Sequence, residues 1–307
     1  MLVAIYSVLL FIALGYFAKR ARMLGNRQGN ILLGFLLNFS LPSAIFKGVY
    51  HSRLDLELML SLFGALACSI LGAVLVLCLA LYVLRFGKEV AITMAFLTCL
   101  HNTLFLGVPM VEGALGSEAA HNAILFDQFC TGLPLAILTP IIMSLSGKGV
   151  FSVRSVGIRL FQNPLFLAML SGFALKALPF SLPQEIFAPI YALAACATPV
   201  ALFAIGVQLS FGDVRLEWQK AGIILAVSML VIPAIYLCSL HIFGVNINSN
   251  HKMALLESSM PPLISSAAVI ARAGLNNKIA VASIVMGIFF SALTTPLWVY
   301  LSGFLMA

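Results

Sequence analysis

Apolar stretches of about 20 residues follow one another along nearly the whole chain, and they limit its fold more than any other feature. A helix needs roughly 20 apolar residues to cross about 30 Å of hydrocarbon. Hydrophobic residues make up 62% of the 307 positions and charged residues 9%, whereas roughly 25% of a soluble domain is charged. We therefore expect an all-α polytopic membrane protein. The ten predicted spans are 2–18, 30–48, 57–84, 89–111, 121–145, 160–178, 187–209, 220–243, 253–271 and 279–304.

The basic residues between these spans are distributed unevenly. Of the 17 Lys and Arg residues, 13 fall in the odd-numbered loops. Because loops rich in Lys and Arg stay on the cytoplasmic side, we expect a protein of the cytoplasmic membrane with both termini outside. This interpretation also accounts for the formal charge of +7 without nucleic acid as a partner.

The second half of the chain repeats the first at an offset of 157 residues. A TPxxxxLSG motif also ends each half, at 139–147 and 295–303. Each copy holds five spans, an odd number, so the second copy must start on the opposite side of the membrane. We expect a first repeat over 1–147, a cytoplasmic connecting loop over 148–159, and a second, inverted repeat over 160–307. The matched pairs are Gly15 and Gly172, Lys19 and Lys176, Pro42 and Pro199, Ala44 and Ala201, and Phe46 and Phe203.

Two polar, proline-bearing patches interrupt the fourth and ninth spans. Residues 101–109 read HNTLFLGVP and residues 258–266 read SSMPPLISS, and the offset of 157 carries one patch onto the other. Unsatisfied backbone groups cost several kcal/mol in hydrocarbon, so such patches need a protein-lined or water-filled cavity. Inverted-repeat transporters place substrate on discontinuous helices of this kind. We therefore expect the two patches to form one site.

The chemistry of the patches favours an anion. A broken helix offers free N–H groups and a positive dipole end, which suits a carboxylate. Neither patch contains Lys or Arg, so neutral donors such as Ser258 and Ser266 would orient the anion. The candidate substrate contacts are His101, Asn102, Thr103, Pro109, Ser259, Pro261, Pro262 and Ser265.

Structural interpretations stand beside these functional ones. Ser and Thr hydroxyls often bond back to their own helix, which would explain Ser258 and Ser259 without a ligand. His101 is open between a proton-responsive group and a packed histidine. Pro42 and Pro199 are predicted to bend helices that flank the site.

Ionisable residues within spans suggest a second role for the site. Asp127 lies well inside the fifth span, and because a lipid-facing charge costs at least ~2.5 kcal/mol, it should face the bundle interior. It is, with His101, a candidate for proton or cation coupling. Glu112 and Glu257 lie nearer the ends of their spans, where we expect a solvated rim. No catalytic or metal-ligand pattern occurs in the sequence, so we expect no enzyme, no cofactor and no metal.

The motif NTLFLGVP at 102–109, the prolines at 261 and 262, and the paired five-span repeats resemble the auxin efflux carrier family. This family of secondary transporters includes plant auxin exporters and bacterial carriers of small organic acids, and the resemblance covers nearly the whole chain. It implies a fold similar to sodium/proton antiporters and bile-acid symporters, in which spans four and nine unwind and cross.

The resemblance also implies an elevator motion of the crossed helices and a carboxylate held by Asn102, with Gln128 as a further contact. Plant members tend to carry a second proline later in the ninth span, where this chain has Ser265 or Ser266. The break in this span therefore stays open between Pro261 and Ser266.

Together these patterns predict a secondary active or facilitative transporter of a small organic anion, such as a carboxylate, that works by elevator-type alternating access. The alternatives are a sodium- or proton-coupled importer of organic acids and, in another class, a membrane receptor or scaffold without transport. The expected partners are the anion, the lipid bilayer and, in a homodimer, a second copy of the chain. Substrate identity, direction and coupling stay open at this level.

Overall fold

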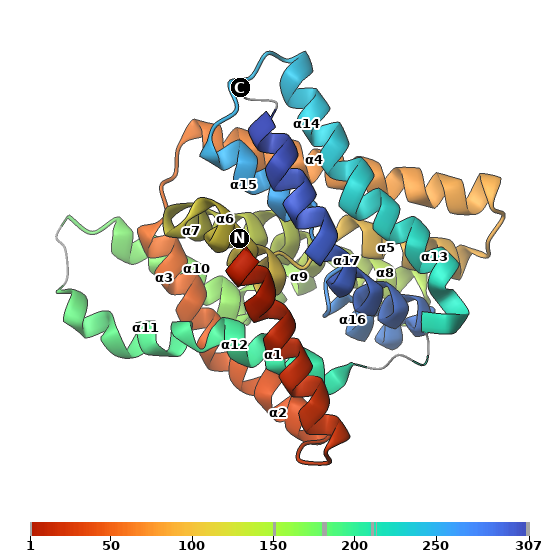
Figure 1. Cartoon of the computed structure of the whole chain (residues 1–307), viewed down its shortest axis with the longest axis horizontal. Coiled ribbons are helices and arrows are strands. Elements are labelled where there is room, and N and C mark those ends of the chain that lie inside the picture. Colours follow the sequence, from red (N-terminus) through yellow and green to blue (C-terminus); the bar gives the residue numbers. More distant parts are fainter. Residues whose placement is uncertain (1, 150–151, 180–182, 210–211, 213, 305–307) are drawn as a thin grey trace.

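The computed structural model describes residues 2–149, 152–179, 183–209, 212 and 214–304 (Figure 1). These residues contain seven helical stretches long and apolar enough to cross a membrane: Leu2–Arg20, Asn26–His51, Leu56–Val83, Ser117–Leu145, Glu185–Gln208, Val214–Ile242 and Asn277–Gly303. The sequence prediction of an all-helical, multi-span membrane protein is confirmed. Three of the ten predicted spans are not among the seven. The fourth and ninth are discontinuous, and the sixth is the shorter apolar helix Pro164–Lys176.

The helices follow one another with short connections. One of them, α9, lies largely in the stretch predicted as a connecting loop, 148–159, of which residues 150 and 151 are outside the described part of the chain. The bounds are α1 Leu2–Arg20, α2 Asn26–Phe35, α3 Leu41–His51, α4 Leu56–Cys78, α5 Lys88–Cys99, α6 Val108–Leu115, α7 Ser117–Phe126, α8 Leu133–Leu145, α9 Val153–Phe161, α10 Pro164–Lys176, α11 Ala188–Ala195, α12 Ala197–Gln208, α13 Val214–Ala226, α14 Ile232–Ile242, α15 Ser249–Ser258, α16 Ser266–Ala273 and α17 Asn277–Phe304.

Prolines reshape these helices without stopping them. Proline lacks an N–H, and its ring collides with the carbonyl four residues earlier in a regular α-helix. A wider π-helical turn before the proline relieves this collision. Such turns, each ending two residues before a proline, are Leu36–Ser40 before Pro42, Thr103–Gly107 before Pro109, Asp127–Gly132 before Pro134 and Val227–Val231 before Pro233. Pro199 lies in the first turn of α12, directly after the interruption that separates α12 from α11.

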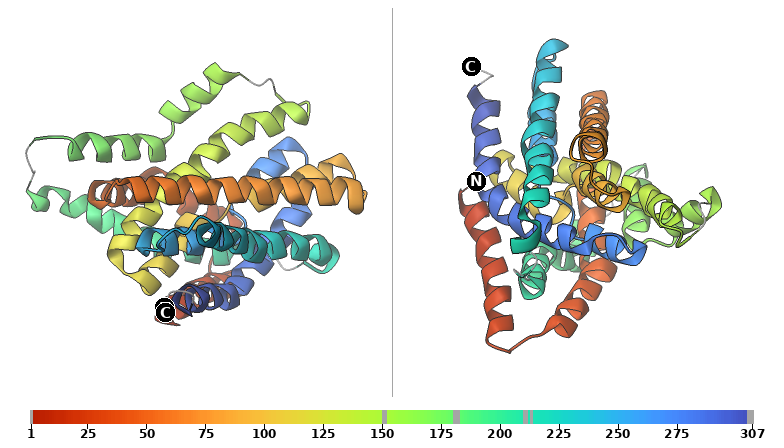
Figure 2. Two further views of the ribbon diagram at one scale, coloured as in Figure 1. Left: turned by 90° about the horizontal axis from the view of Figure 1, so that it is seen from above. Right: turned by 90° about the vertical axis from the view of Figure 1, so that its right-hand side faces the viewer.

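Apart from α9, which contacts α8 and α10, the helices form two groups, which Figures 1 and 2 show from three directions. In the flanking group, α1 packs on α12 and α10 packs on α3, with α2 and α11 beside them. The crossover group holds α4 to α8 and α13 to α17, and in it α4 runs beside the nearly continuous α13–α14 rod (Figure 2). The two groups meet where α3 packs on α7 and α1 packs on α6.

Glycines allow α1 and α12 to approach within backbone contact. A Cβ at Gly15 would overlap the carbonyl oxygen of Phe203, and a Cβ at Gly206 would overlap the carbonyl oxygen of Ile12. Each helix thus presents its glycine to the backbone of the other. Only a residue without a side chain fits at either position.

Two lysines donate hydrogen bonds to backbone carbonyls at the C-terminal ends of helices in the flanking group. The Nζ of Lys19 donates to the backbone carbonyl of Leu209 at 3.2 Å, just beyond the end of α12. The Nζ of Lys176 donates to the backbone carbonyl of Ser52, just beyond the end of α3. In both cases a cation meets the negative end of a helix dipole, which stabilises the packed pair.

Candidate functional site

The fourth and ninth predicted spans are both interrupted, and their interruptions cross. In the fourth span, α5 ends at Cys99 and the next helical segment begins at Thr103. In the ninth, α15 ends at Ser258 and α16 begins at Ser266, so the chain is unwound from 259 to 265. This fixes the break that the sequence left open.

Two backbone hydrogen bonds join the two segments where they cross. The Asn102 N–H donates to the Pro261 carbonyl at 2.7 Å, and the Leu263 N–H donates to the Leu100 carbonyl at 2.9 Å. Between them His101 and Pro262 form an antiparallel bridge in which neither residue uses its own N–H. Pro262 has no N–H to offer, so proline is tolerated there without an unsatisfied donor.

All predicted polar contacts at the crossing except Ser265 are buried. Neither polar atom of the Asn102 amide, nor the Nε2 of His101, has a hydrogen-bond partner among the described residues. The hydroxyls of Ser258 and Ser259 donate to carbonyls of their own helix at 2.6 and 2.7 Å, as in the structural interpretation of these serines. Ser265 is exposed.

Asp127 belongs to the fifth span, and its carboxylate lies at the start of the second half of the broken fourth span, beside Thr103. Its carboxylate accepts from the Thr103 hydroxyl at 2.6 Å and from the Gln128 amide at 2.8 Å, and it bonds with the backbone of Leu104. The carboxylate therefore lies at the positive end of this helical segment, where the sequence suggested a substrate anion. Asp127 faces the bundle interior, as expected, and Gln128 donates to Asp127 in this structure.

The prediction that Glu257 lies on a solvated rim is wrong. Its side chain is fully buried, and its carboxyl packs against Gly107, where an added Cβ would overlap it. The position of a residue within an apolar run indicates only its depth along a span. The burial of Glu257 results from the packing of α15 against α4, α6 and α7. Glu112, expected on the same kind of rim, is exposed.

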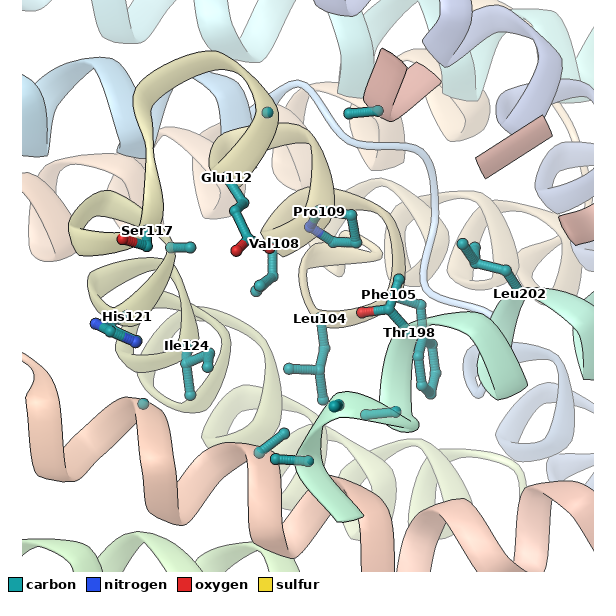
Figure 3. Close-up of a pocket in the computed structure, with 18 of the residues that line it drawn as sticks. Leu104, Phe105, Val108, Pro109, Glu112, Ser117, His121, Ile124, Thr198 and Leu202 are labelled. Atoms are coloured by element: carbon teal, nitrogen blue, oxygen red, sulfur yellow. The ribbon is translucent and has the colours of Figure 1, made fainter. Parts of the chain in front are cut away.

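A cavity of about 840 Å³ opens between the two helix groups (Figure 3). Helices α1, α3 and α12 of the flanking group form one wall, and α6 and α7 of the crossover group form the other. Figure 3 shows Leu104 and Pro109 of the broken fourth span between His121 of α7 and Thr198 of α12. Of the candidate substrate contacts, Pro109 lines this cavity, while Asn102 and the ninth-span prolines are buried at the crossing and do not line it.

Three basic side chains line the same cavity, and the sequence analysis missed them. Lys47 and His51 lie one turn apart on α3, and the rings of His51 and His121 stack with centroids 5.4 Å apart. Tyr191 connects the cluster: His51 Nε2 lies 2.9 Å from its hydroxyl, and Lys47 Nζ lies 5.3 Å from its ring centroid. Lys47 lies within the predicted span 30–48, and a charged residue inside a span is itself a functional signal.

Comparison with known proteins identifies the chain. A family profile described as "Membrane transport protein" matches residues 1–299. The chain belongs to this family, that of the auxin efflux carriers. The resemblance found in the sequence is confirmed, and the protein is a transporter and not an enzyme.

Relatives of this transporter match it along nearly their whole length. An uncharacterized transporter of Methanothermobacter thermautotrophicus is 26% identical over 96% of each chain. The uncharacterized transporter YfdV of Escherichia coli is 22% identical over 96% of this chain and 95% of its own. A protein of Rhizobium meliloti named putative malonate transporter is 25% identical, over 94% and 92% respectively.

The transporter also has a smaller cavity, of about 170 Å³, beside the crossing. Asp127, Gln128 and Ser265 line it. Leu41, Leu104 and Phe105 line both cavities and so separate one from the other. The predicted contacts are therefore divided between two cavities and the buried crossing.

Proposed function

We propose that this transporter carries a small organic anion, such as a carboxylate, across the cytoplasmic membrane, and that the anion binds in the 840 Å³ cavity. The observation that carries the proposal is the cluster of Lys47, His51 and His121 in a cavity between the two helix groups. Charged hydrogen bonds to carboxylates are among the strongest in proteins. Glu112 also lines this cavity. Because its carboxylate repels an anion, we expect the anion to bind on the side of the cavity formed by Lys47.

The identity of one relative supports a carboxylate. The Rhizobium meliloti protein is named a putative malonate transporter, and malonate is small enough for the cavity. Asn102 remains a proposed contact, because its amide is buried and unpartnered two residues before Leu104, which lines the cavity.

We propose that the flanking and crossover groups are built from two inverted five-span repeats, with ten spans and both termini outside. Reciprocal contacts support this arrangement: Lys19 binds the carbonyl of Leu209, and Lys176 binds that of Ser52. Both lysines and both acceptors are separated by 157 residues. A twofold axis between the repeats would produce such exchanged pairs.

We propose further that the crossover group moves as a unit against the flanking group. The hydrophobic residues Leu41, Leu104 and Phe105 separate the two cavities in this conformation. If α6 and α7 shift along α1 and α3, the crossover group would carry the bound anion with it and expose the binding site on the opposite side of the membrane. This is the elevator motion that the resemblance implies.

The test is malonate counterflow into proteoliposomes. We expect wild-type protein to exchange labelled for unlabelled malonate, and Lys47→Met to raise the apparent KM about tenfold or more, because a hydrogen bond to a charged group contributes about 1.5–3 kcal/mol. Lys278→Met, at an exposed lysine of α17, is the matched control, and Asn102→Ala tests the crossing. An unchanged KM in Lys47→Met would refute the cavity assignment, and wild-type protein that exchanges neither malonate nor other small carboxylates would favour a receptor or scaffold.

A further inference from the structure

Glu257 is fully buried and has no hydrogen-bond partner in the described part of the chain. Its side chain is 0% exposed, and neither carboxyl oxygen has a hydrogen-bond partner among the described residues. Asp127, the other acid of this region, accepts from Thr103 and Gln128. The two carboxyls lie close enough to interact electrostatically. They differ in that Asp127 accepts hydrogen bonds from side chains whereas Glu257 has no donor among the described residues.

The surroundings of Glu257 provide no positive charge. Among the described residues, the buried side chains of the Asp, Glu, His, Lys and Arg types are His101, Asp127, His251 and Glu257, without a single Lys or Arg. The thiol of Cys130 lies close enough to both carboxyls to interact with them electrostatically. On the elements packed against α15, the other titratable groups are Glu57, Cys68 and Cys78 of α4, Glu112 of α6, Glu118 and His121 of α7, Tyr236, Cys238 and His241 of α14, and Lys278 and Tyr300 of α17.

An ionised carboxylate in such a place is strongly disfavoured. Buried charges are paired, hydrogen-bonded or neutralised, and two adjacent carboxylates repel each other. Donors stabilise the carboxylate of Asp127, whereas Glu257 has none among the described residues. A positive charge from outside the protein must therefore compensate Glu257 whenever it is buried as it is here.

The position of Glu257 connects this charge to the substrate. Its carboxyl lies against Gly107, in the helical segment whose residues Leu104, Phe105 and Pro109 line the large cavity. The Gly107 N–H bonds to the Asn102 carbonyl at 3.2 Å, which brings the unpartnered Asn102 amide to the same segment. One face of this segment therefore serves the cavity, and another holds the acid.

We propose that Glu257 is the binding site of a monovalent cation, a proton or a sodium ion, that crosses the membrane together with the substrate anion. The proposal rests on the proposed function. Neutralising Glu257 removes a negative charge from beside the anion cavity, so the cation strengthens anion binding, and the anion strengthens cation binding by the same factor. Gly107 is required because any side chain there would displace the carboxyl.

The experiment compares two modes of malonate transport by Glu257→Gln, which keeps the shape of the side chain and removes its charge. The first mode is counterflow without ion gradients, and the second is net accumulation driven by an inward proton gradient or an inward sodium gradient. We expect one gradient to raise wild-type accumulation by about tenfold, within the usual range of coupling. Glu257→Gln should still catalyse counterflow but should not respond to either gradient.

Glu118→Gln is the matched control, because its side chain is 68% exposed and pairs with Arg53; it should respond like wild type. Wild-type accumulation that ignores both gradients, a Glu257→Gln variant that still follows one, or a folded variant without counterflow would each overturn the proposal. The gradient that drives wild-type transport distinguishes a proton from sodium.

A binding measurement separates this proposal from the proposed function. The melting temperature of purified protein is measured with sodium against choline, and at two pH values, because a cation bound to the folded state raises stability by mass action. We expect a shift in wild type that Glu257→Gln lacks. If wild type exchanges no carboxylate, the proposed function fails, while this difference would still support a cation site; equal shifts in both proteins would overturn it.

Discussion

The close approach of α1 and α12 predicts that Gly15→Ala destabilises the protein. A Cβ at this position would overlap the Phe203 carbonyl oxygen and lie 3.0 Å from both the Phe203 carbonyl carbon and the Val207 nitrogen, whereas carbon atoms pack best at roughly 3.5–4.0 Å. All three obstacles are backbone atoms of α12, so no side-chain rotation can relieve the overlap. The helices must separate.

The size of the effect follows from two opposing terms. Overpacking of this kind costs about 1–3 kcal/mol, and replacing Gly by Ala inside a helix returns up to about 1 kcal/mol. We therefore expect a net loss on the order of 1–2 kcal/mol, or a melting temperature lower by roughly 1.5–3 °C. Gly206→Ala should behave alike, because its Cβ would overlap the Ile12 carbonyl.

The control is Gly34→Ala on α2, where an added Cβ meets nothing within 4 Å. It should leave stability unchanged or raise it by up to about 1 kcal/mol. Thermal unfolding of the purified variants, followed by size-exclusion chromatography after heating, measures all three. If Gly15→Ala, like Gly34→Ala, has a melting temperature equal to or above that of wild type, the backbone contact between α1 and α12 is refuted.

Three further changes test separate parts of the structure. Thr103→Val removes a hydrogen-bond donor from the buried carboxylate of Asp127, and we expect the free energy of unfolding to fall by about 1–3 kcal/mol. Thr103→Ser keeps a hydroxyl and should restore the stability. Equal stability of wild type and both variants in thermal unfolding would contradict the hydrogen bond. Leu263→Pro deletes the N–H that donates to the Leu100 carbonyl, so we expect this variant not to fold, whereas Leu263→Met should fold. A proline variant that elutes as folded protein in size-exclusion chromatography would argue against the crossing. Lys19→Met and Lys176→Met should each lose about 0.5–1.5 kcal/mol, and because the sites share no partner their losses should add in the double variant; a clearly unequal pair of losses would weaken the twofold relation.

The ionisable residues show where sequence reasoning reached the site and where it stopped. Asp127 lies in the middle of an apolar run, so the cost of exposing its charge to lipid was enough to place it inside the bundle. Glu257 lies near the end of such a run, and the same argument placed it wrongly at the rim. Lys47 lies within the predicted span 30–48, but only the structure showed that it lines the cavity from α3.

The site itself was predicted in part. The repeat offset paired the two polar patches, and the structure joins them through the backbone of Asn102 and Pro261. The N-terminal end of the second half-helix was expected to hold an anion, and it holds the Asp127 carboxylate, which comes from a different span. Which side chain reaches such a helix end depends on how spans pack, and no local pattern encodes that.

The sequence by itself determined the class of protein, the approximate spans, the two points where helices break and the family to which the chain belongs. These follow from short-range physics: apolar length against bilayer thickness, and the missing N–H of proline. Only the tertiary structure decided that HNTLFLGVP and SSMPPLISS meet in an antiparallel bridge between His101 and Pro262, that Lys47 lies beside two histidines, and that Glu257 is buried against Gly107. Each of these results from contacts between residues far apart in the chain, where shape and packing choose the neighbours and composition does not.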